Sequence, residues 1–173
     1  MQWSEMIHRK GKNTKLTLNL TPRKIQFKSL FQVYVKNKKL KEWTAIKKEL
    51  LVREGAQCWI CGRESLNLHI QEFWHYDDDN HLLNLQEIHH VCDLCHKIKR
   101  TDIWFFTEYG KEQLKQLDLC WEDLIKHYCK VNRCSLKVFA INWREAIQTW
   151  KSRNIHEWQI DFGVYEPRKD YLT

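Results

Sequence analysis

Apolar residues in the first third of the chain recur with the spacing of one helical face. Trp43, Ile46, Leu50 and Leu51 follow an i, i+3, i+7, i+8 pattern, and lysines occupy the other faces. Gly55 comes shortly after the last of them, and glycine is common just past the end of a helix. The pattern therefore predicts an amphipathic helix that ends before Gly55.

Alternation of polar and apolar residues predicts extended segments. Residues 15–21 alternate and predict a short strand, while residues 66–76 and 81–91 predict two more. The polar residues 77–80 between the last two are typical of a turn. A helix is expected from Asp93 onward, because an aspartate is favourable in the first turn.

The last third of the chain is predicted to be helical. Apolar residues between 119 and 128 suit one amphipathic helix, and Ser135 is a favoured N-cap for a second helix that carries Trp150. Residues 158–165 alternate and predict a short strand or an ordered tail. Together these elements predict an α+β fold with helices flanking the strands.

The composition is that of one globular domain. The chain has 173 residues, of which 43% are hydrophobic and 29% charged. We divide it into a basic N-terminal arm at 1–40, a core at 41–110 and a helical C-terminal extension at 111–173 that packs on the core. The sequence has no apolar run long enough for a membrane span, and its first residues do not form a signal peptide. We therefore expect a cytoplasmic protein with no membrane partner.

Positive charge is concentrated at the beginning of the chain. The net charge is +7, yet residues 1–50 carry 13 Lys and Arg against 3 Glu, which leaves the remainder at −3. Such a segment favours a polyanion partner, most simply nucleic acid and in particular DNA. The alternative is a solvated arm that only aids solubility. The basic residues expected to contact nucleic acid are Arg9, Lys10, Lys36, Lys38, Lys39 and Lys41.

Four of the seven cysteines form two C-x2-C pairs, Cys58 with Cys61 and Cys92 with Cys95. Two intervening residues let both thiolates reach one ion, and four thiolates complete a tetrahedral zinc site with no position left for substrate. We therefore predict a structural Zn²⁺ held by these four residues. The alternatives are two redox dithiols or four unrelated buried cysteines, and the remaining cysteines are taken as core or surface thiols.

Histidines and acidic residues gather between the two cysteine pairs. Strand alternation places His69 and His75 on the face that also carries Gln71, with Glu72 on the other face. Such a group can bind a second, catalytic divalent ion and supply a general base. The candidate catalytic residues are Glu72, His75, His69 and His90.

The order of C-x2-C, strand, turn and C-x2-C-His resembles the HNH endonucleases, and in particular a branch of small bacterial proteins of that family. A stretch of the form His-Glu-x-Trp-x-Tyr-Asp in that branch corresponds here to residues 71–77, Gln-Glu-Phe-Trp-His-Tyr-Asp. Similar segments at 127–134 and 150–163 extend the resemblance over most of the chain.

The resemblance implies a treble-clef, ββα-metal core in which a four-cysteine zinc site joins a β-hairpin to a helix. It also implies that His96 points into the cleft and binds the catalytic ion (Mg²⁺, Mn²⁺ or Ni²⁺), and that a group on the first strand activates water. The implied activity is metal-dependent hydrolysis of phosphodiester bonds in nucleic acid.

The chain departs from the family pattern at two positions. Gln71 stands where the family has His, and a carboxamide cannot act as a general base. The position nine residues before His96, where the family has Asn, is Glu87, and Asn84 lies three residues further back. The alternative function is therefore a catalytically degenerate HNH-fold zinc protein that binds nucleic acid or a protein partner, with a homodimer among the options. A third hypothesis is a redox or metal sensor.

Overall fold

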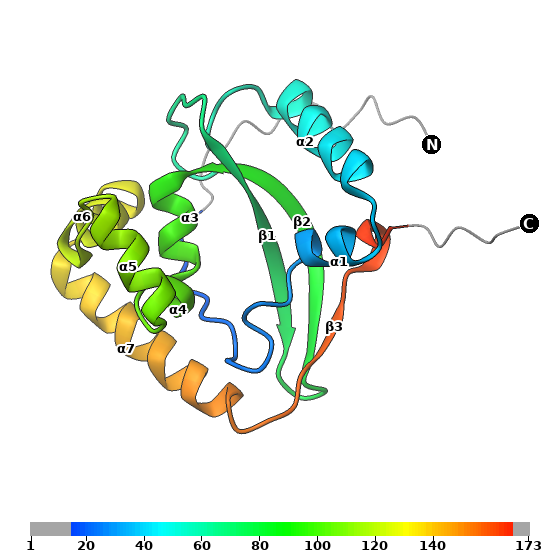
Figure 1. Cartoon of the computed structure of the whole chain (residues 1–173). Coiled ribbons are helices and arrows are strands. Elements are labelled where there is room, and N and C mark those ends of the chain that lie inside the picture. Colours follow the sequence, from blue (N-terminus) through cyan, green and yellow to red (C-terminus); the bar gives the residue numbers. More distant parts are fainter. Residues whose placement is uncertain (1–14, 168–173) are drawn as a thin grey trace, which may run out of the picture.

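A two-stranded antiparallel hairpin forms the centre of the protein, for which the computed structural model describes residues 15–167 (Figure 1). Strand β1 (Leu68–Asp77) pairs with strand β2 (Leu82–Cys92) in a register that runs from Leu68 opposite Cys92 to Asp77 opposite Leu82. A β-bulge interrupts the register between Phe73 and Trp74. The two strands and the turn agree with the sequence prediction to within about two residues.

A short third strand completes the sheet. Strand β3 (Gln159–Asp161) pairs in parallel with the beginning of β2, which gives the order β1-β2-β3. A 3-10 turn follows at Gly163–Tyr165. Arg153 at the end of the last helix donates two hydrogen bonds of 2.7 Å to Asp78 in the hairpin turn, so the chain returns to the hairpin before it forms β3.

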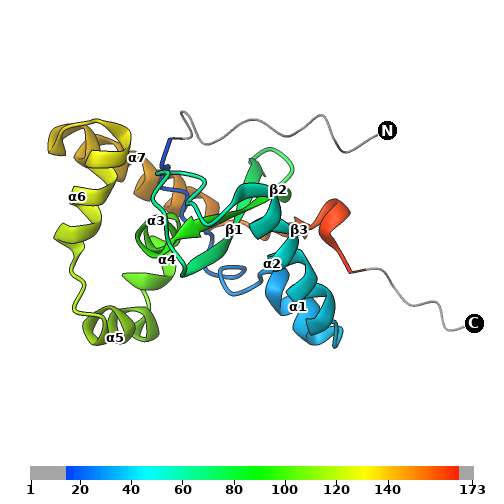
Figure 2. The ribbon, with the colours of Figure 1, turned by 90° about the horizontal axis from the view of Figure 1, so that it is seen from above.

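Seven helices lie in the described part of the chain, most of them on the two sides of the hairpin. They are α1 (Leu30–Lys36), α2 (Leu40–Glu54), α3 (Asp93–Lys99), α4 (Thr101–Trp104), α5 (Glu108–Gln116), α6 (Trp121–Asn132) and α7 (Leu136–Arg153). Helices α1 and α2 lie at one end of the molecule and α6 and α7 at the other, as both ribbon views show (Figures 1 and 2). Within residues 15–167, no helix has the length and apolar character of a membrane span.

Two hydrophobic cores hold these helices. Leu30 and Leu50 from α1 and α2 pack against Leu85 and Ile88 of β2. A larger core on the other side joins α3, α6 and α7 to the end of β2 and to the cysteine pairs, with members such as Val91, Ile98, Leu124, Phe139 and Trp150. The end of the hairpin that carries the second cysteine pair is therefore embedded in the larger core.

The strand predicted at 15–21 is wrong. The alternation is real, because Leu16, Leu18 and Leu20 are buried in the larger core, but this segment has no regular secondary structure. Its backbone is bound by a side chain instead: Asn132 of α6 accepts a hydrogen bond from the Leu16 amide and donates one to the Leu16 carbonyl, each 2.9 Å long. Alternating apolar residues indicate only that one side of a segment is buried. A loop packed against helices buries every second side chain just as a strand does.

The predicted helix ends agree with the structure. Helix α2 stops at Glu54, and Gly55 follows with a φ of 74°, a left-handed conformation that glycine adopts without strain. Ser135 accepts a hydrogen bond from the Val138 amide and so caps α7 as expected. Helices α1, α4 and α5 were not predicted, because they are short.

Candidate metal centre

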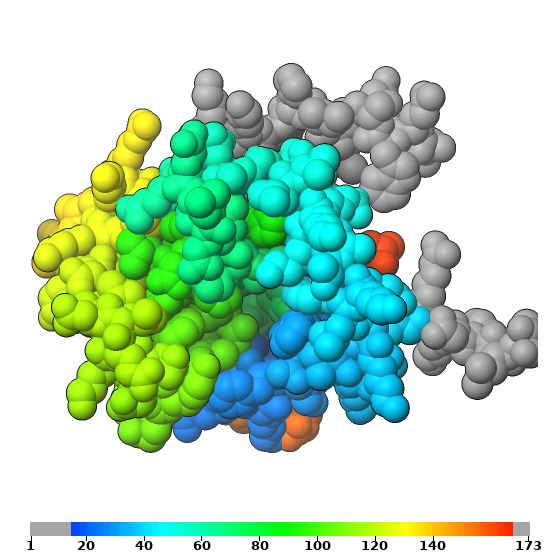
Figure 3. All heavy atoms as spheres, turned by 45° about the horizontal axis from the view of Figure 1, so that its top comes forward, coloured from blue at the N-terminus to red at the C-terminus, as the bar shows by residue number. Residues whose placement is uncertain are grey.

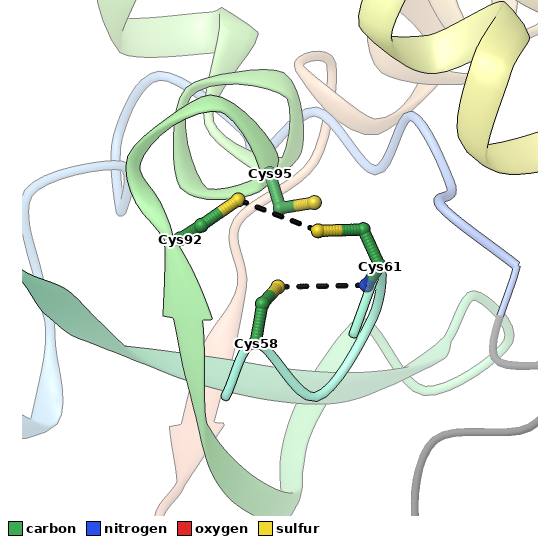
Figure 4. Close-up of side chains that lie close together, drawn as sticks. All are labelled: Cys58, Cys61, Cys92 and Cys95. Atoms are coloured by element: carbon green, nitrogen blue, oxygen red, sulfur yellow. Dashed lines mark hydrogen bonds between the residues drawn. The ribbon is translucent and has the colours of Figure 1, made fainter. Parts of the chain in front are cut away.

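The four cysteines of the two C-x2-C pairs come together at one end of the hairpin (Figure 4). Cys58 and Cys61 lie in the loop between α2 and β1, Cys92 is the last residue of β2, and Cys95 lies in the first turn of α3. Their ligand atoms are all within 4.8 Å of one another, and the sulfurs of Cys61 and Cys92 are 3.6 Å apart. All four are free thiols.

This geometry fits a tetrahedral metal. Four sulfurs at about 2.3 Å from one zinc ion lie about 3.8 Å from each other, which is close to the spacing found here. Cys58, Cys92 and Cys95 are buried, so water has little access to the group. The four cysteines could therefore hold a structural metal such as zinc, and four thiolates leave no open position for substrate.

The loop around the first pair is shaped to present its sulfurs. Gly62 has a φ of 71°, which lets the chain turn directly after Cys61. The Cys61 amide points at the Cys58 sulfur at 3.5 Å, and the Trp59 amide donates to the His90 carbonyl at 2.8 Å. The second bond fixes this loop to β2, the strand that carries Cys92.

The cysteines strongly affect one another electrostatically. Contact with the Cys61 thiol opposes ionisation of Cys58, but hydrogen bonds from Cys92 and Cys95 outweigh it and lower the pKa of Cys58 to about 6. Hydrogen bonds to Cys58, Cys61 and Cys92 raise the pKa of the buried Cys95 thiol. Thiolates packed this closely repel each other, and a bound divalent cation removes that repulsion.

A fifth side chain reaches the cysteines from the C-terminal helices. His127 of α6 is buried, and its Nε2 lies 3.2 Å from the sulfur of Cys95. His127 is not among the site residues predicted from the sequence, because it lies 32 residues after Cys95 and no spacing rule links the two positions. An N–H donor to a metal-bound thiolate orients that ligand and partly neutralises its charge.

His96 lies next to the cysteine group, between α3 and β1. Its Nδ1 is 3.1 Å from Oε1 of Gln71, and its ring stacks on His69 with 4.8 Å between centroids. Gln71 is only 3% exposed. Burial lowers the pKa of His96 to about 3, and burial also lowers the pKa of His69. The structure thus brings together His69, Gln71 and His96, as strand alternation and the C-x2-C-His motif predict.

His69 also approaches the beginning of α3. Its Nε2 lies 3.3 Å from Asp93 Oδ1, but not in line for a hydrogen bond, and it has no other hydrogen-bond partner within residues 15–167. A buried ring nitrogen without a partner is uncommon in folded proteins. The Asp93 carboxylate is therefore the charged group closest to this ring nitrogen among the contacts found in residues 15–167.

The other candidate catalytic residues lie apart from this group. The carboxylate of Glu72 accepts a hydrogen bond of 2.7 Å from the Leu30 amide at the beginning of α1, and burial raises its pKa. His75 is exposed near the far end of β1. His90 is buried, and its backbone amide donates to Glu54.

His89, which was not among the predicted catalytic residues, is held between two carboxylates. Its Nδ1 is 2.9 Å from Glu54 and its Nε2 is 2.9 Å from Glu87, while its ring stacks on Trp59 with 3.9 Å between centroids. Carboxylates only accept hydrogen bonds, so both ring nitrogens of His89 face acceptor groups. Burial opposes ionisation of Glu54, but its hydrogen bonds to His89, His90 and Arg53 outweigh burial and lower its pKa.

The lysines predicted to contact nucleic acid lie on α1, α2 and the turn between them. Lys36, Lys38 and Lys41 are exposed, and Lys39 forms an ion pair of 3.2 Å with Glu42. Arg9 and Lys10 lie outside the described residues.

Comparisons with protein-family models, with curated proteins and with solved structures found no match. Among residues 15–167, the four cysteines form the only group of three or more His, Cys, Asp or Glu side chains close enough to hold a metal ion. Inferences about function therefore rest on the residues themselves.

Proposed function

We propose that the protein is a metal-dependent endonuclease of the HNH type that hydrolyses phosphodiester bonds of nucleic acid, most simply DNA. The observation that carries the proposal is the contact between His96 and Gln71, which joins the helix after the second cysteine pair to the first strand of the hairpin. In a treble-clef ββα-metal core this is the position of the catalytic centre, beside a structural zinc site.

The donor atoms at this position support a second divalent ion. Neighbouring ligands of an octahedral ion at about 2.1 Å lie about 3.0 Å apart. His96 Nδ1 and Gln71 Oε1 are 3.1 Å apart, so both could bind one ion of this kind, with water and phosphate oxygens filling the remaining positions. When bound, such an ion stabilises negative charge on the phosphate as a Lewis acid.

The remaining roles fall to other side chains near by. His69 is next to His96, and its Nε2, which lies 3.3 Å from Asp93 Oδ1, could take the proton of an attacking water. The lysines of α1 and α2 bind phosphates with little dependence on base sequence. A thiolate zinc centre is stable in a reducing compartment, which agrees with a cytoplasmic protein.

One set of observations favours a second candidate, a non-catalytic zinc protein that binds nucleic acid or a protein partner. Gln71 cannot accept a proton, and the Glu72 carboxylate is engaged by the Leu30 amide. Within the described part of the chain, His96 belongs to no group of three strong metal ligands. The same scaffold without a working centre would retain the four-cysteine site and the lysines.

Metal counting and a cleavage assay on one sample distinguish the two candidates. The protein is purified without added zinc, zinc per chain is measured, and supercoiled plasmid is incubated with Mg²⁺, Mn²⁺ or Ni²⁺. His96→Ala is compared with His156→Ala, a control that removes an exposed imidazole just after α7.

The endonuclease proposal expects about one zinc per chain, together with metal-stimulated nicking that His96→Ala abolishes and His156→Ala retains. Zinc with salt-sensitive DNA binding but no cleavage under any ion would favour the second candidate. A protein without zinc would contradict both.

A further inference from the structure

We infer that helices α1 and α2 form a binding surface for single-stranded nucleic acid, in which Phe31 stacks on an unpaired base and the neighbouring lysines contact phosphates. The inference rests on the proposed function in one respect, namely that the partner is a nucleic acid. It adds the strand state of that partner and the residue that selects it.

Three aromatic rings form a row across the two helices. Trp43 of α2 lies between Phe31 and Tyr34 of α1, with 5.5 Å between ring centroids on each side. Tyr34 is buried, and its hydroxyl donates to the Tyr165 carbonyl at 3.0 Å. The row is therefore fixed at its inner end, and Phe31 at the outer end is 41% exposed.

Other apolar side chains on the same helices are also exposed. Val35 follows Phe31 by one helical turn and is 40% exposed, and Leu40 at the beginning of α2 is 51% exposed. Neighbouring apolar residues left in water are costly, and on soluble proteins they typically mark a binding surface. Together with the rigid aromatic row, this favours a partner that offers flat, partly apolar groups.

The positive charge around these residues indicates an anionic partner. Between residues 28 and 48 the sequence has seven lysines and a single acidic residue, Glu42. Lys36, Lys38 and Lys41 are exposed on the same two helices and in the turn between them. Two copies of such a surface would repel each other, so a polyanion suits it better than a second copy of this chain.

An aromatic ring surrounded by lysines distinguishes single strands from duplexes. In a duplex the base faces are already stacked on one another, and only their edges are accessible in the grooves. In a single strand each base has a free face, which stacks on aromatic side chains while basic residues follow the backbone. The space-filling view shows α2 at the surface of the molecule, where a strand can reach it (Figure 3).

The test compares two labelled probes, an oligothymidine of about 12 nucleotides and a mixed-sequence duplex of the same length, by fluorescence anisotropy over a range of salt concentrations. Phe31→Leu is expected to weaken single-strand binding by about 5- to 100-fold and to leave duplex binding unchanged. Phe31→Tyr keeps the ring and is expected to keep the affinity. Tyr109→Leu on α5 is the matched control, because it removes another exposed aromatic ring.

The lysines are tested through the salt dependence of the same assay. Lys38→Gln and Lys41→Gln are each expected to reduce the slope of log affinity against log salt by about 0.7 for the single strand. Lys137→Gln, an exposed lysine on α7, is expected to leave the slope unchanged. Zinc content and melting temperature are measured for every variant, so that a misfolded protein is recognised.

Several outcomes would overturn the inference. Equal affinity of the two probes, an equal effect of Phe31→Leu and Tyr109→Leu, or an equal affinity for a polyglutamate peptide would each show that charge alone determines binding. A dimer in light scattering that Phe31→Leu dissociates, without a change in strand affinity, would assign the surface to self-association. In all these cases, metal-dependent nicking that His96→Ala abolishes would still support the proposed function, so the two failures are distinguishable.

Discussion

The two candidate functions differ in the role that they give to Gln71. Its Oε1 contacts His96 Nδ1 and its side chain is buried, so it shapes the site while lacking any group that can take a proton. Gln71→His would add a third imidazole beside His69 and His96, and imidazole is a much stronger ligand for Mn²⁺ or Ni²⁺ than a carboxamide. We expect the variant to keep its zinc and to increase nicking with these ions.

The control for this substitution is Gln71→Leu, which has a similar size and no polar atoms. It leaves His96 Nδ1 without its partner, and we expect a loss of about 1–3 kcal/mol in the free energy of unfolding and no gain in nicking. If Gln71→His behaves like Gln71→Leu in the plasmid assay, the second candidate, a scaffold without catalysis, is favoured.

Lys99 is a buried lysine without a carboxylate partner in the described part of the chain. Its Nζ donates to Thr17 at 2.9 Å and lies 5.2 Å from the ring centre of Phe73, and burial lowers its pKa to about 8. At pH 7 the folded and unfolded chains both carry the proton, so the folded chain bears the full cost of burying the charge. Between pH 8 and about 10.5 the folded chain loses the proton first, and stability from this group rises with pH.

Lys99→Met removes the buried charge at every pH. We expect it to raise the free energy of unfolding by about 1–3 kcal/mol at pH 7, an advantage over the native chain that disappears by about pH 10.5. Urea unfolding at several pH values measures this difference, with Lys111→Met on the surface of α5 as the control. A constant difference between pH 7 and about 10.5 would contradict a lowered Lys99 pKa.

At the scale of the elements, one carboxylate of the hairpin holds the beginning of α1. Glu72 accepts a hydrogen bond from the Leu30 amide, which is one of the free donors at the start of a helix, and Ser29 accepts another from Gln32. Glu72→Ala is expected to cost about 1–2 kcal/mol of stability and to speed hydrogen exchange of the α1 amides. Glu72→Gln keeps an acceptor and should be close to the native chain in both measurements.

The same pair of variants tests the expectation that Glu72 is catalytic. A residue that only fixes α1 leaves nicking intact in Glu72→Gln, since the helix remains capped. Loss of nicking in a Glu72→Gln protein with native stability and zinc content would instead place this carboxylate in the reaction.

The elements that could be predicted from the sequence are those with a strong local signal. The hairpin strands, Gly55 after α2 and Ser135 before α7 each follow from periodicity or from the conformational preference of one residue. The segment at 15–21 could not be resolved in this way, because its alternation reflects burial against α6 and other helices distant in sequence. The β-bulge after Phe73 has no signal in a single sequence either, since it depends on how two strands meet.

Some residues of the candidate sites could likewise be predicted from the sequence, and others could not. Cys58, Cys61, Cys92 and Cys95 could be predicted as one group, because C-x2-C spacing constrains each pair and both pairs bracket the hairpin. His127 and the Glu54–His89 contact could not be predicted, since each joins segments that only tertiary packing brings together. Sequence reasoning finds metal ligands that are close in the chain more readily than the side chains that support them.

At the scale of the whole molecule, the cysteine group connects segments that lie far apart in the sequence. The loop after α2, the end of β2 and the beginning of α3 each contribute sulfurs, and His127 brings in α6. Because the unfolded chain has no such site, the binding free energy of a metal here adds directly to folding stability. Removal of zinc with a strong chelator should therefore lower the melting temperature of the whole chain in one transition.

His127 provides a specific test of this coupling. His127→Leu removes the ring nitrogen that lies 3.2 Å from the Cys95 sulfur, and loss of such a supporting contact typically costs about 10- to 100-fold in metal affinity. We expect zinc to transfer correspondingly faster to a competing chromophoric chelator, while His156→Leu, which alters an exposed histidine just after α7, keeps the native rate. Equal rates in the two variants would mean that α6 packs beside the metal centre without stabilising it, and the C-terminal helices would then be coupled to the cysteines only through the apolar core.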